Sequence, residues 1–393
     1  MITRENRVRR RPARRFLLLP VPGGALESYE LKGPRAWPRP DARPTSRVAY
    51  AAAHVVADPL AAPGTATLDW DTTLAYRRHL WSYGMRVADA MDTAQRNRGL
   101  DWEATRELIR RSAAEAKTFG DPYELLACGA GTDQAPDAAS LDAVTAAYTE
   151  QAGVVEDAGA RVILMASRQL AAVARGPEDY HEVYGRVLDQ VSRPVILHWL
   201  GEMFDPHLAG YWGSPDLEPA TESFLSLVRS HASSIDGVKV SLLDAAHETR
   251  LRASLPSGVR LYTGDDLDYP SLIKDGSDAL LGIFDAIAPA ASAALAALDQ
   301  GEPETYDAIF ARTLPLARKI FEAPTHDYKT GIVFLAWLAG YQDAFVMVAG
   351  AQSARSVLHL TDVFRLADQA GLLPDPDLAV RRMRSFLTTA GVL

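Results

Sequence analysis

Lys239 lies in the middle of an otherwise apolar segment, IDGVKVSLLD, at positions 235–244. Lysine is the minor cation of this chain, with six copies among the 41 lysine and arginine residues. Side chains alternate between the two faces of a β-strand, so a strand here places Gly237, Lys239 and Ser241 on one face and two valines on the other. Because the valines suit a helix-covered outer face, we expect Lys239 to point into the interior of the fold.

A lysine held away from water is suited to chemistry that arginine cannot perform. Burial lowers the pKa of the amine and populates its neutral form, which can attack a carbonyl carbon to form a Schiff base. A guanidinium stays protonated and cannot react in this way. The alternative is a structural role, in which Lys239 pairs with an interior carboxylate or extends its amine to the rim of the fold.

Two other apolar runs end in residues that could act with this lysine. His198 ends the run PVILHW and could transfer protons near neutral pH, although a lone histidine is more often a hydrogen-bonded core residue. Another run ends in YTGDD, where Gly264 permits a close approach of the backbone. The next two residues, Asp265 and Asp266, are expected to cap the following helix.

The loop AMDTAQR combines several polar side chains within one turn. Asp92, Thr93 and Gln95 lie in it, and Arg96 closes it. Such a loop can bind a carboxylate through its hydroxyl and backbone N–H groups. The alternative is an ordinary turn that caps a helix.

A metal centre is the competing use of the histidine and acidic side chains. The candidate nitrogen and oxygen ligands are His54, Asp58, Asp92, His198 and Asp265. No HxH or HExxH spacing supports this use, so we expect neither a metal nor another cofactor. The single cysteine, Cys128, excludes an internal disulfide and a cysteine-based zinc site, and its apolar surroundings predict a buried, inert thiol.

Eight short apolar runs alternate with longer amphipathic stretches and must position these side chains. The runs occupy residues 47–57, 85–91, 123–130, 161–167, 194–199, 237–243, 259–264 and 278–284. Near-continuous apolar strands separated by helices are typical of parallel strands covered on both faces. Eight such units predict an α/β fold, the (β/α)₈ TIM barrel, with its site at the carboxyl ends of the strands. A doubly wound open sheet is the alternative, but no GxGxxG follows the first strand and no P-loop occurs.

The barrel is expected to span residues 47–300, between an N-terminal segment (1–46) and a C-terminal helical extension (301–393). The N-terminal segment is predicted to contain a basic tail, a β-hairpin around a Gly-Gly pair and a proline-rich linker. The extension shows only helical patterns. One of them, residues 331–350, is apolar almost all round and should be buried against the barrel or in a subunit contact.

Composition argues against several classes of function. The net charge of −9 gives no support for nucleic-acid binding, and no run of eighteen apolar residues is present to span a membrane. The arginine-rich start resembles a twin-arginine export signal, but Pro20 and Pro22 interrupt its apolar part. We therefore expect a cytoplasmic protein that acts on a small molecule.

Several motifs occur in a characteristic order along the predicted barrel. GVKVS stands on the sixth strand, TGDD follows the seventh, GSDALLGIFDAIAP accompanies the eighth, and a helical extension completes the chain. This order resembles the dihydrodipicolinate synthase / N-acetylneuraminate lyase superfamily. AMDTAQR, AAHVVADP and ILHW are more narrowly similar to an uncharacterised bacterial branch of the dihydrodipicolinate synthase family, a domain of unknown function.

The resemblance implies class I, Schiff-base chemistry on pyruvate or a related 2-oxo acid. Lys239 falls on the imine-forming lysine of the superfamily. Thr93 falls near the second threonine of the loop that holds the carboxylate of the 2-oxo acid. Two positions depart from the pattern. Asp92 replaces the first threonine of that loop, where an anionic side chain would repel a carboxylate, and His198 replaces the catalytic tyrosine.

We therefore expect a lyase or aldolase that forms or cleaves a carbon–carbon bond through an imine at Lys239, with His198 as general acid and base. The expected substrate-binding residues are Asp92, Thr93, Gln95, Ser241 and Gly264. The expected partner is a 2-oxo acid, and the apolar helix favours a homo-oligomer. The alternatives are a divalent-metal-dependent aldolase and an altered barrel that binds a small ligand without turnover.

Overall fold

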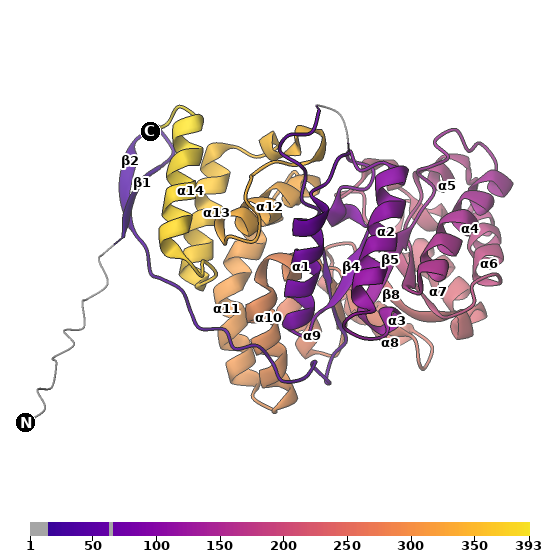
Figure 1. The fold of residues 1–393 in the computed structure, drawn as a ribbon. Helices are drawn as coiled ribbons and strands as arrows, with labels where there is room; N and C mark the ends of the chain where they lie inside the picture. The colour runs from indigo at the N-terminus through magenta and orange to yellow at the C-terminus, as the bar shows by residue number, and fades with distance from the viewer. Residues whose placement is uncertain (1–14, 63–65) are drawn as a thin grey trace, which may run out of the picture.

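Eight parallel strands form a closed barrel in the part of the chain that the structure describes, residues 15–62 and 66–393 (Figure 1). In this computed structural model the strands are β3 (Ala49–Ala52), β4 (Arg86–Asp89), β5 (Leu126–Ala130), β6 (Arg161–Leu164), β7 (Val195–Leu200), β8 (Ile235–Ser241), β9 (Arg260–Thr263) and β10 (Asp278–Leu281). They follow one another around the barrel in chain order, and β10 closes it against β3. The predicted TIM barrel is confirmed.

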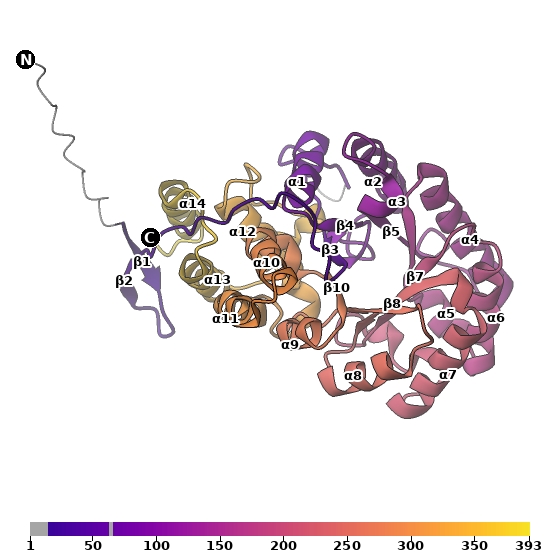
Figure 2. The same cartoon turned by 90° about the horizontal axis from the view of Figure 1, so that it is seen from below.

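Helices cover the outside of the barrel between successive strands (Figure 2). They are α1 (Trp70–Ser82), α2 (Trp102–Ala116), α3 (Pro122–Leu125), α4 (Leu141–Ala158), α5 (Arg168–Val173), α6 (Pro177–Leu188), α7 (Leu217–Ser230), α8 (Ala245–Ser254), α9 (Tyr269–Lys274) and α10 (Ile283–Asp299). Asp69, Asp101 and Ser140 each accept a backbone N–H of the helix that follows, which fixes where the strand–helix loop ends.

Short 3₁₀ helices lie in the loops of the barrel and of the extension. They are η1 (Asp92–Ala94), η2 (Pro206–Leu208), η3 (Tyr211–Gly213), η4 (Ala232–Ser234), η5 (Thr325–Asp327) and η6 (Val348–Ser353). None of the helices within the described ranges is both long and apolar enough to cross a membrane.

Alternation along the strands sorts the side chains into an inner and an outer layer. Val238 and Val240 belong to the outer core, between the strands and the helices. The inner core consists of Tyr50, Ala52, Ala88, Met91, Ala127, Ile163, Met165, Ile196, Tyr262 and Leu280. Lys239, which lies between the two valines, therefore points into the barrel.

The register of three neighbouring strands sets the position of the interior polar groups along the barrel axis. His198 on β7 pairs with Lys239 on β8, and Lys239 pairs with Tyr262 on β9. The Tyr262 ring turns toward the amino-terminal end of the barrel. A Cβ added to Gly237 would lie 2.6 Å from that ring, and the Tyr262 hydroxyl donates to Asp236 at 2.6 Å. Tyr262 therefore fills the barrel on the amino-terminal side of Lys239.

The predicted N-terminal β-hairpin and C-terminal helical extension are both confirmed. The two pack together at one side of the barrel (Figures 1 and 2). The elements are β1 (Phe16–Pro20), β2 (Leu26–Glu30), α11 (Pro303–Ile320), α12 (Tyr328–Leu338), α13 (Val357–Ala370) and α14 (Pro376–Thr389). The Tyr29 hydroxyl donates to Asp368 at 2.8 Å, and its ring meets Phe364 edge-on, which holds the hairpin on α13. The expected basic tail falls on residues 1–14, outside the described residues.

The prediction of an apolar helix over residues 331–350 is wrong in its C-terminal boundary. α12 is buried along its whole length, as expected, but it ends at Leu338. Gly340 adopts a φ of 89°, and the Tyr341 N–H bonds back to the Ala336 carbonyl at 3.0 Å. This is the left-handed glycine ending of a helix, and the apolar residues beyond it continue as an irregular segment into η6.

A buried carboxyl on α8 fixes the strand next to Lys239. Glu248 accepts hydrogen bonds from Thr263, at the end of β9, and from Ser277, just before β10, at 3.0 and 3.1 Å. Burial raises the pKa of this carboxyl to about 8. The folded protein therefore binds the proton more tightly than the unfolded chain does, so the stability it contributes is complete in acid and is lost as the pH rises through about 8.

We predict that Glu248→Gln removes this pH dependence. Wild-type stability should fall by up to roughly 1.4 kcal/mol for each pH unit between about 5 and 8, and the variant should show a much smaller loss. Denaturant unfolding at several pH values measures both curves, with the exposed Glu304→Gln as the matched control. Equal slopes in the wild type and the Glu248 variant would contradict the prediction.

Candidate active site

The Lys239 amine is enclosed at the carboxyl end of β8, and only 8% of the residue is exposed. Within the described chain, its Nζ has no hydrogen-bond or ion-pair partner. Burial lowers its pKa to about 8; the charges of Asp266 and Asp92 oppose this shift, and that of Lys329 adds to it. An amine with this pKa is partly neutral at physiological pH, as nucleophilic attack requires.

Asp266 is the carboxylate whose charge acts most strongly on Lys239. It was expected only to cap a helix, together with Asp265. Neither caps the following helix α9, whose start has no side-chain cap: Asp265 accepts two backbone N–H groups of the turn before it, and Asp266 reaches across to the start of α10 and accepts the Ile283 N–H at 2.7 Å. Burial raises the pKa of the Asp266 carboxyl to about 7. Lys239 and Asp266 thus form a buried acid–base couple in which burial disfavours both charges.

His198 lies beside Lys239 and is neutral at physiological pH. Burial, and secondly the charge of Lys239, lower its pKa well below the usual range. Its Nε2 lies 3.2 Å from the Ser241 hydroxyl, and its Nδ1 is buried with no hydrogen-bond partner among the described residues. Lys239 and Ser241, predicted to share one face of their strand, therefore lie together with His198, which keeps one ring nitrogen without a partner among the described residues.

Gly264 makes room for this group. A Cβ at this position would lie 2.1 Å from the Ser241 hydroxyl oxygen and 3.0 Å from Cε of Lys239. The first distance is far inside van der Waals contact, and the second is a few tenths of an ångström too short. The predicted close approach of the backbone at Gly264 is therefore an approach to Ser241 and Lys239 themselves.

The loop at Asp92 joins the barrel to the C-terminal extension. The Thr93 hydroxyl hydrogen-bonds the Tyr328 hydroxyl at 2.8 Å. The Gln95 side chain donates to the Val348 carbonyl at 3.0 Å and accepts the Val348 N–H at 3.1 Å. Asp92 is half-buried and its charge acts on Lys239. Two of the three side chains are thus engaged by the extension, a contact that no local sequence pattern could indicate.

The proposed metal ligands are dispersed. His54 is hydrogen-bonded to Asp285 at 2.6 Å and to Gln342 at 3.1 Å, and Asp265 caps its own turn. Among residues 15–62 and 66–393, no three histidine, cysteine, aspartate or glutamate side chains are grouped so that they could hold an ion. Cys128 is buried in the outer core, and burial raises its pKa, so it has the inert environment expected.

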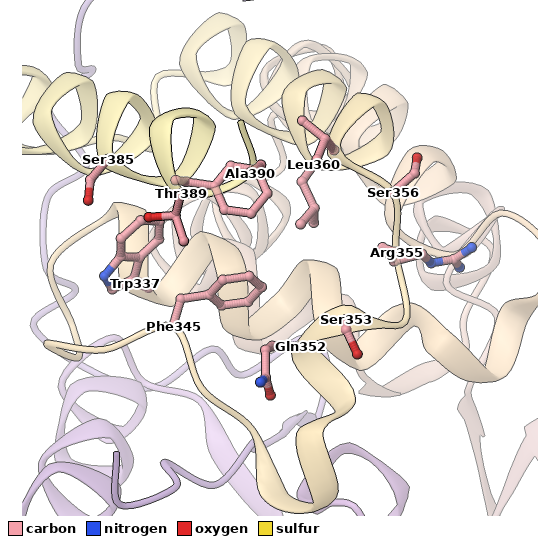
Figure 3. A pocket seen from close by; sticks show the side chains of 12 residues that line it. Trp337, Phe345, Gln352, Ser353, Arg355, Ser356, Leu360, Ser385, Thr389 and Ala390 are labelled. Carbon is pink, nitrogen blue, oxygen red and sulfur yellow. The ribbon is translucent and has the colours of Figure 1, made fainter. Parts of the chain in front are cut away.

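A cavity of about 560 Å³ lies away from the barrel mouth, between α12, α13 and α14 (Figure 3). Figure 3 shows aromatic side chains around it, with polar groups nearby. The lining includes Trp337, Phe345, Gln352, Leu360, Ser385, Phe386 and Thr389. None of the candidate site residues lines it, so it is separate from the site around Lys239.

Solved structures share the fold over most of this chain at low sequence identity. A prophage protein of the dihydrodipicolinic acid synthase family from E. coli K12, solved in complex with pyruvate, is 13% identical and has a TM-score of 0.63 over 88% of this chain and 99% of its own. A dihydrodipicolinate synthase from Bacillus clausii is 14% identical, with a TM-score of 0.62 over 82% and 96%. The 4-hydroxy-tetrahydrodipicolinate synthase of Methylacidiphilum fumariolicum SolV is 16% identical, with a TM-score of 0.61 over 83% and 99%.

These similarities confirm the expected resemblance at the level of the fold. A comparison with curated proteins gives no match. A family model described as "Protein of unknown function (DUF993)" matches residues 17–392, which is nearly the whole chain. The protein therefore belongs to this family, built on the barrel of the dihydrodipicolinate synthases.

Proposed function

We propose that this protein is a Schiff-base-forming (class I) lyase or aldolase that acts on pyruvate or a related 2-oxo acid. The observation that carries the proposal is the enclosed Lys239 amine, unpaired within the described chain and with its pKa lowered to about 8, beside the neutral His198. The fold shared with dihydrodipicolinate synthases, one of whose relatives was solved with pyruvate, supports the assignment.

The first step forms the imine. The neutral amine of Lys239 attacks the ketone carbon of the 2-oxo acid, the ketone oxygen takes up protons, and loss of water leaves a C=N bond. At a pKa of about 8, roughly a tenth of the amine is neutral at pH 7. At the usual lysine pKa near 10.4 the fraction would be below roughly one in a thousand.

His198 is proposed to move the protons of this step and of the next. Its Nδ1, which has no hydrogen-bond partner among the described residues, can accept a proton, and Ser241 holds the ring through Nε2. The protonated imine then withdraws electrons from the neighbouring carbon. Loss of a proton from that carbon gives an enamine that can attack an electrophile, and the reverse sequence cleaves the carbon–carbon bond.

The other predicted residues take supporting places in this proposal. Gly264 leaves space beside the Lys239 amine, and the negative charge of Asp92 raises the pKa of that amine. Thr93 and Gln95 hold the C-terminal extension over the mouth through Tyr328 and Val348.

We predict that borohydride reduction in the presence of pyruvate attaches one reduced adduct to the wild-type protein, at Lys239. Lys239→Gln should abolish the adduct because glutamine has no amine that can form the imine. Mass spectrometry of peptides locates the modification, and Lys274→Gln, a surface lysine paired with Asp307, is the matched control. If no 2-oxo acid gives an adduct at Lys239, the imine mechanism fails. Ligand-induced thermal stabilisation without trapping would then favour a barrel that binds without turnover.

A second prediction concerns pH. The rate of adduct formation should rise with pH through about 8 and then level off, because the neutral amine is the reactive form. Asp266→Asn should move this midpoint to lower pH, since the Asp266 charge raises the pKa of Lys239, while the asparagine oxygen can still accept the Ile283 N–H. Initial trapping rates between pH 6 and 10 measure both midpoints. A midpoint near 10 in the wild type, or an upward shift in the variant, would contradict the prediction.

A further inference from the structure

Lys329 is a second buried lysine at the barrel mouth, and it comes from the C-terminal extension. Only 5% of the residue is exposed. Its Nζ donates a hydrogen bond to the His326 carbonyl at 3.2 Å and lies 4.4 Å from the centroid of the Tyr328 ring. Within the described residues it has no ion-pair partner and no second hydrogen bond. Because an ammonium group has three N–H donors, two of them are left for another acceptor.

Tyr328 places this amine above the ends of the strands. A Cβ added to Gly282, just after β10, would lie 3.2 Å from the Tyr328 ring and 3.6 Å from the Asp266 carboxylate. The Tyr328 hydroxyl is bonded to Thr93 after β4, at 2.8 Å. The start of α12 therefore spans the mouth from β10 to β4 and carries Lys329 with it.

The charges around Lys329 connect it to the site. The groups that act on it are Asp92, Arg98, Asp327 and Asp205. Burial lowers its pKa, and Asp92 is the largest opposing influence. Asp92 also acts on Lys239, and Lys329 lowers the pKa of Lys239 in turn. The two amines therefore lie close enough to influence each other, and the same carboxylate acts on both.

A purely structural role explains this placement poorly. A lysine that stabilises a fold usually pairs with a carboxylate or extends its amine into water. Lys329 is 5% exposed and has no carboxylate partner among the described residues, and it stands in the first turn of α12, where the helix dipole disfavours a positive charge. A buried cation with spare donors is instead suited to binding an anion.

We propose that Lys329 binds the carboxylate of the 2-oxo acid while Lys239 reacts with its ketone. This assignment rests on the function proposed above and names the anion-binding residue of the same site. It also accounts for Asp92, which replaces a threonine of the related loop. A carboxylate bound near Asp92 would be repelled, and Lys329 supplies the compensating charge. The Thr93 hydroxyl and the Gln95 amide are less available for this task because Tyr328 and Val348 engage them.

The experiment compares an acid with its neutral ester. Borohydride trapping is measured against the concentration of pyruvate and of methyl pyruvate, for the wild type, Lys329→Gln, Lys329→Met and the surface control Lys274→Gln. We expect both Lys329 variants to raise the pyruvate concentration that gives half-maximal trapping about tenfold or more, as expected for loss of a charged hydrogen bond. The curves are measured at about pH 9.5, where the Lys239 amine is largely neutral with or without the charge of Lys329. The methyl pyruvate curve should then change little, and the adduct should remain at Lys239.

Two results would overturn the inference. Equal weakening of acid and ester would assign Lys329 a structural role, and no weakening of either would remove it from the site. Thermal unfolding checks that both variants fold, since loss of an underpaired buried charge should not destabilise the protein. If the wild type forms no adduct, the proposed function fails separately. Calorimetric binding of propionate, a carboxylate without a ketone, then still tests Lys329: binding by the wild type that is lost in Lys329→Gln supports it, and equal or absent binding refutes it.

Discussion

Moving an ammonium group from water into a protein interior costs several kcal/mol, and the centre of this barrel is arranged around one such group. The pairing of β7, β8 and β9 puts Lys239 inside the barrel at the level of His198. Tyr262 fills the space toward the amino-terminal end. The extension covers the carboxyl end through Tyr328. These groups leave only 8% of Lys239 exposed, and this burial lowers the pKa of its amine.

The charges around the amine then determine how far the pKa of Lys239 is lowered. Asp266 and Asp92 favour the protonated amine, whereas burial and Lys329 favour the neutral one. If the Lys239 amine were fully paired with a carboxylate, it would stay protonated and could not act as a nucleophile. If no other cation lay near it, the site would have no charged group to bind the carboxylate of an acidic substrate. Two lysines with two carboxylates at one mouth avoid both extremes. In our proposal one amine reacts and the other binds.

The barrel could be predicted from the sequence because the patterns that indicate its strands and helices lie within short segments of chain. Near-continuous apolar strands, alternation around Lys239 and capping residues such as Ser140 each act within a few positions. The shared inward direction of Lys239 and Ser241 followed from the same alternation, and the pairing of β7 with β8 brings His198 to them. The extension of the apolar helix to residue 350 failed because a single glycine in the left-handed conformation outweighs apolar periodicity.

The rest of the site could not be predicted, because it depends on contacts over long stretches of chain. Tyr328 meets Thr93 across more than two hundred residues, and Gln95 meets Val348 across a similar span. Asp266 resembles its neighbour Asp265 in sequence and differs only in the direction of its side chain. Lys329 begins an apolar helix and gives no local sign that it is a second amine at the mouth.

In our proposal, Lys239 is the covalent centre of a 2-oxo acid site. A crystal structure of the protein soaked with pyruvate tests it most directly. We predict continuous electron density from Nζ of Lys239 to the ketone carbon of pyruvate, with the carboxylate within hydrogen-bond distance of Nζ of Lys329. Pyruvate bound elsewhere, or bound at the mouth with the Lys239 amine unmodified and paired to a carboxylate, would contradict it.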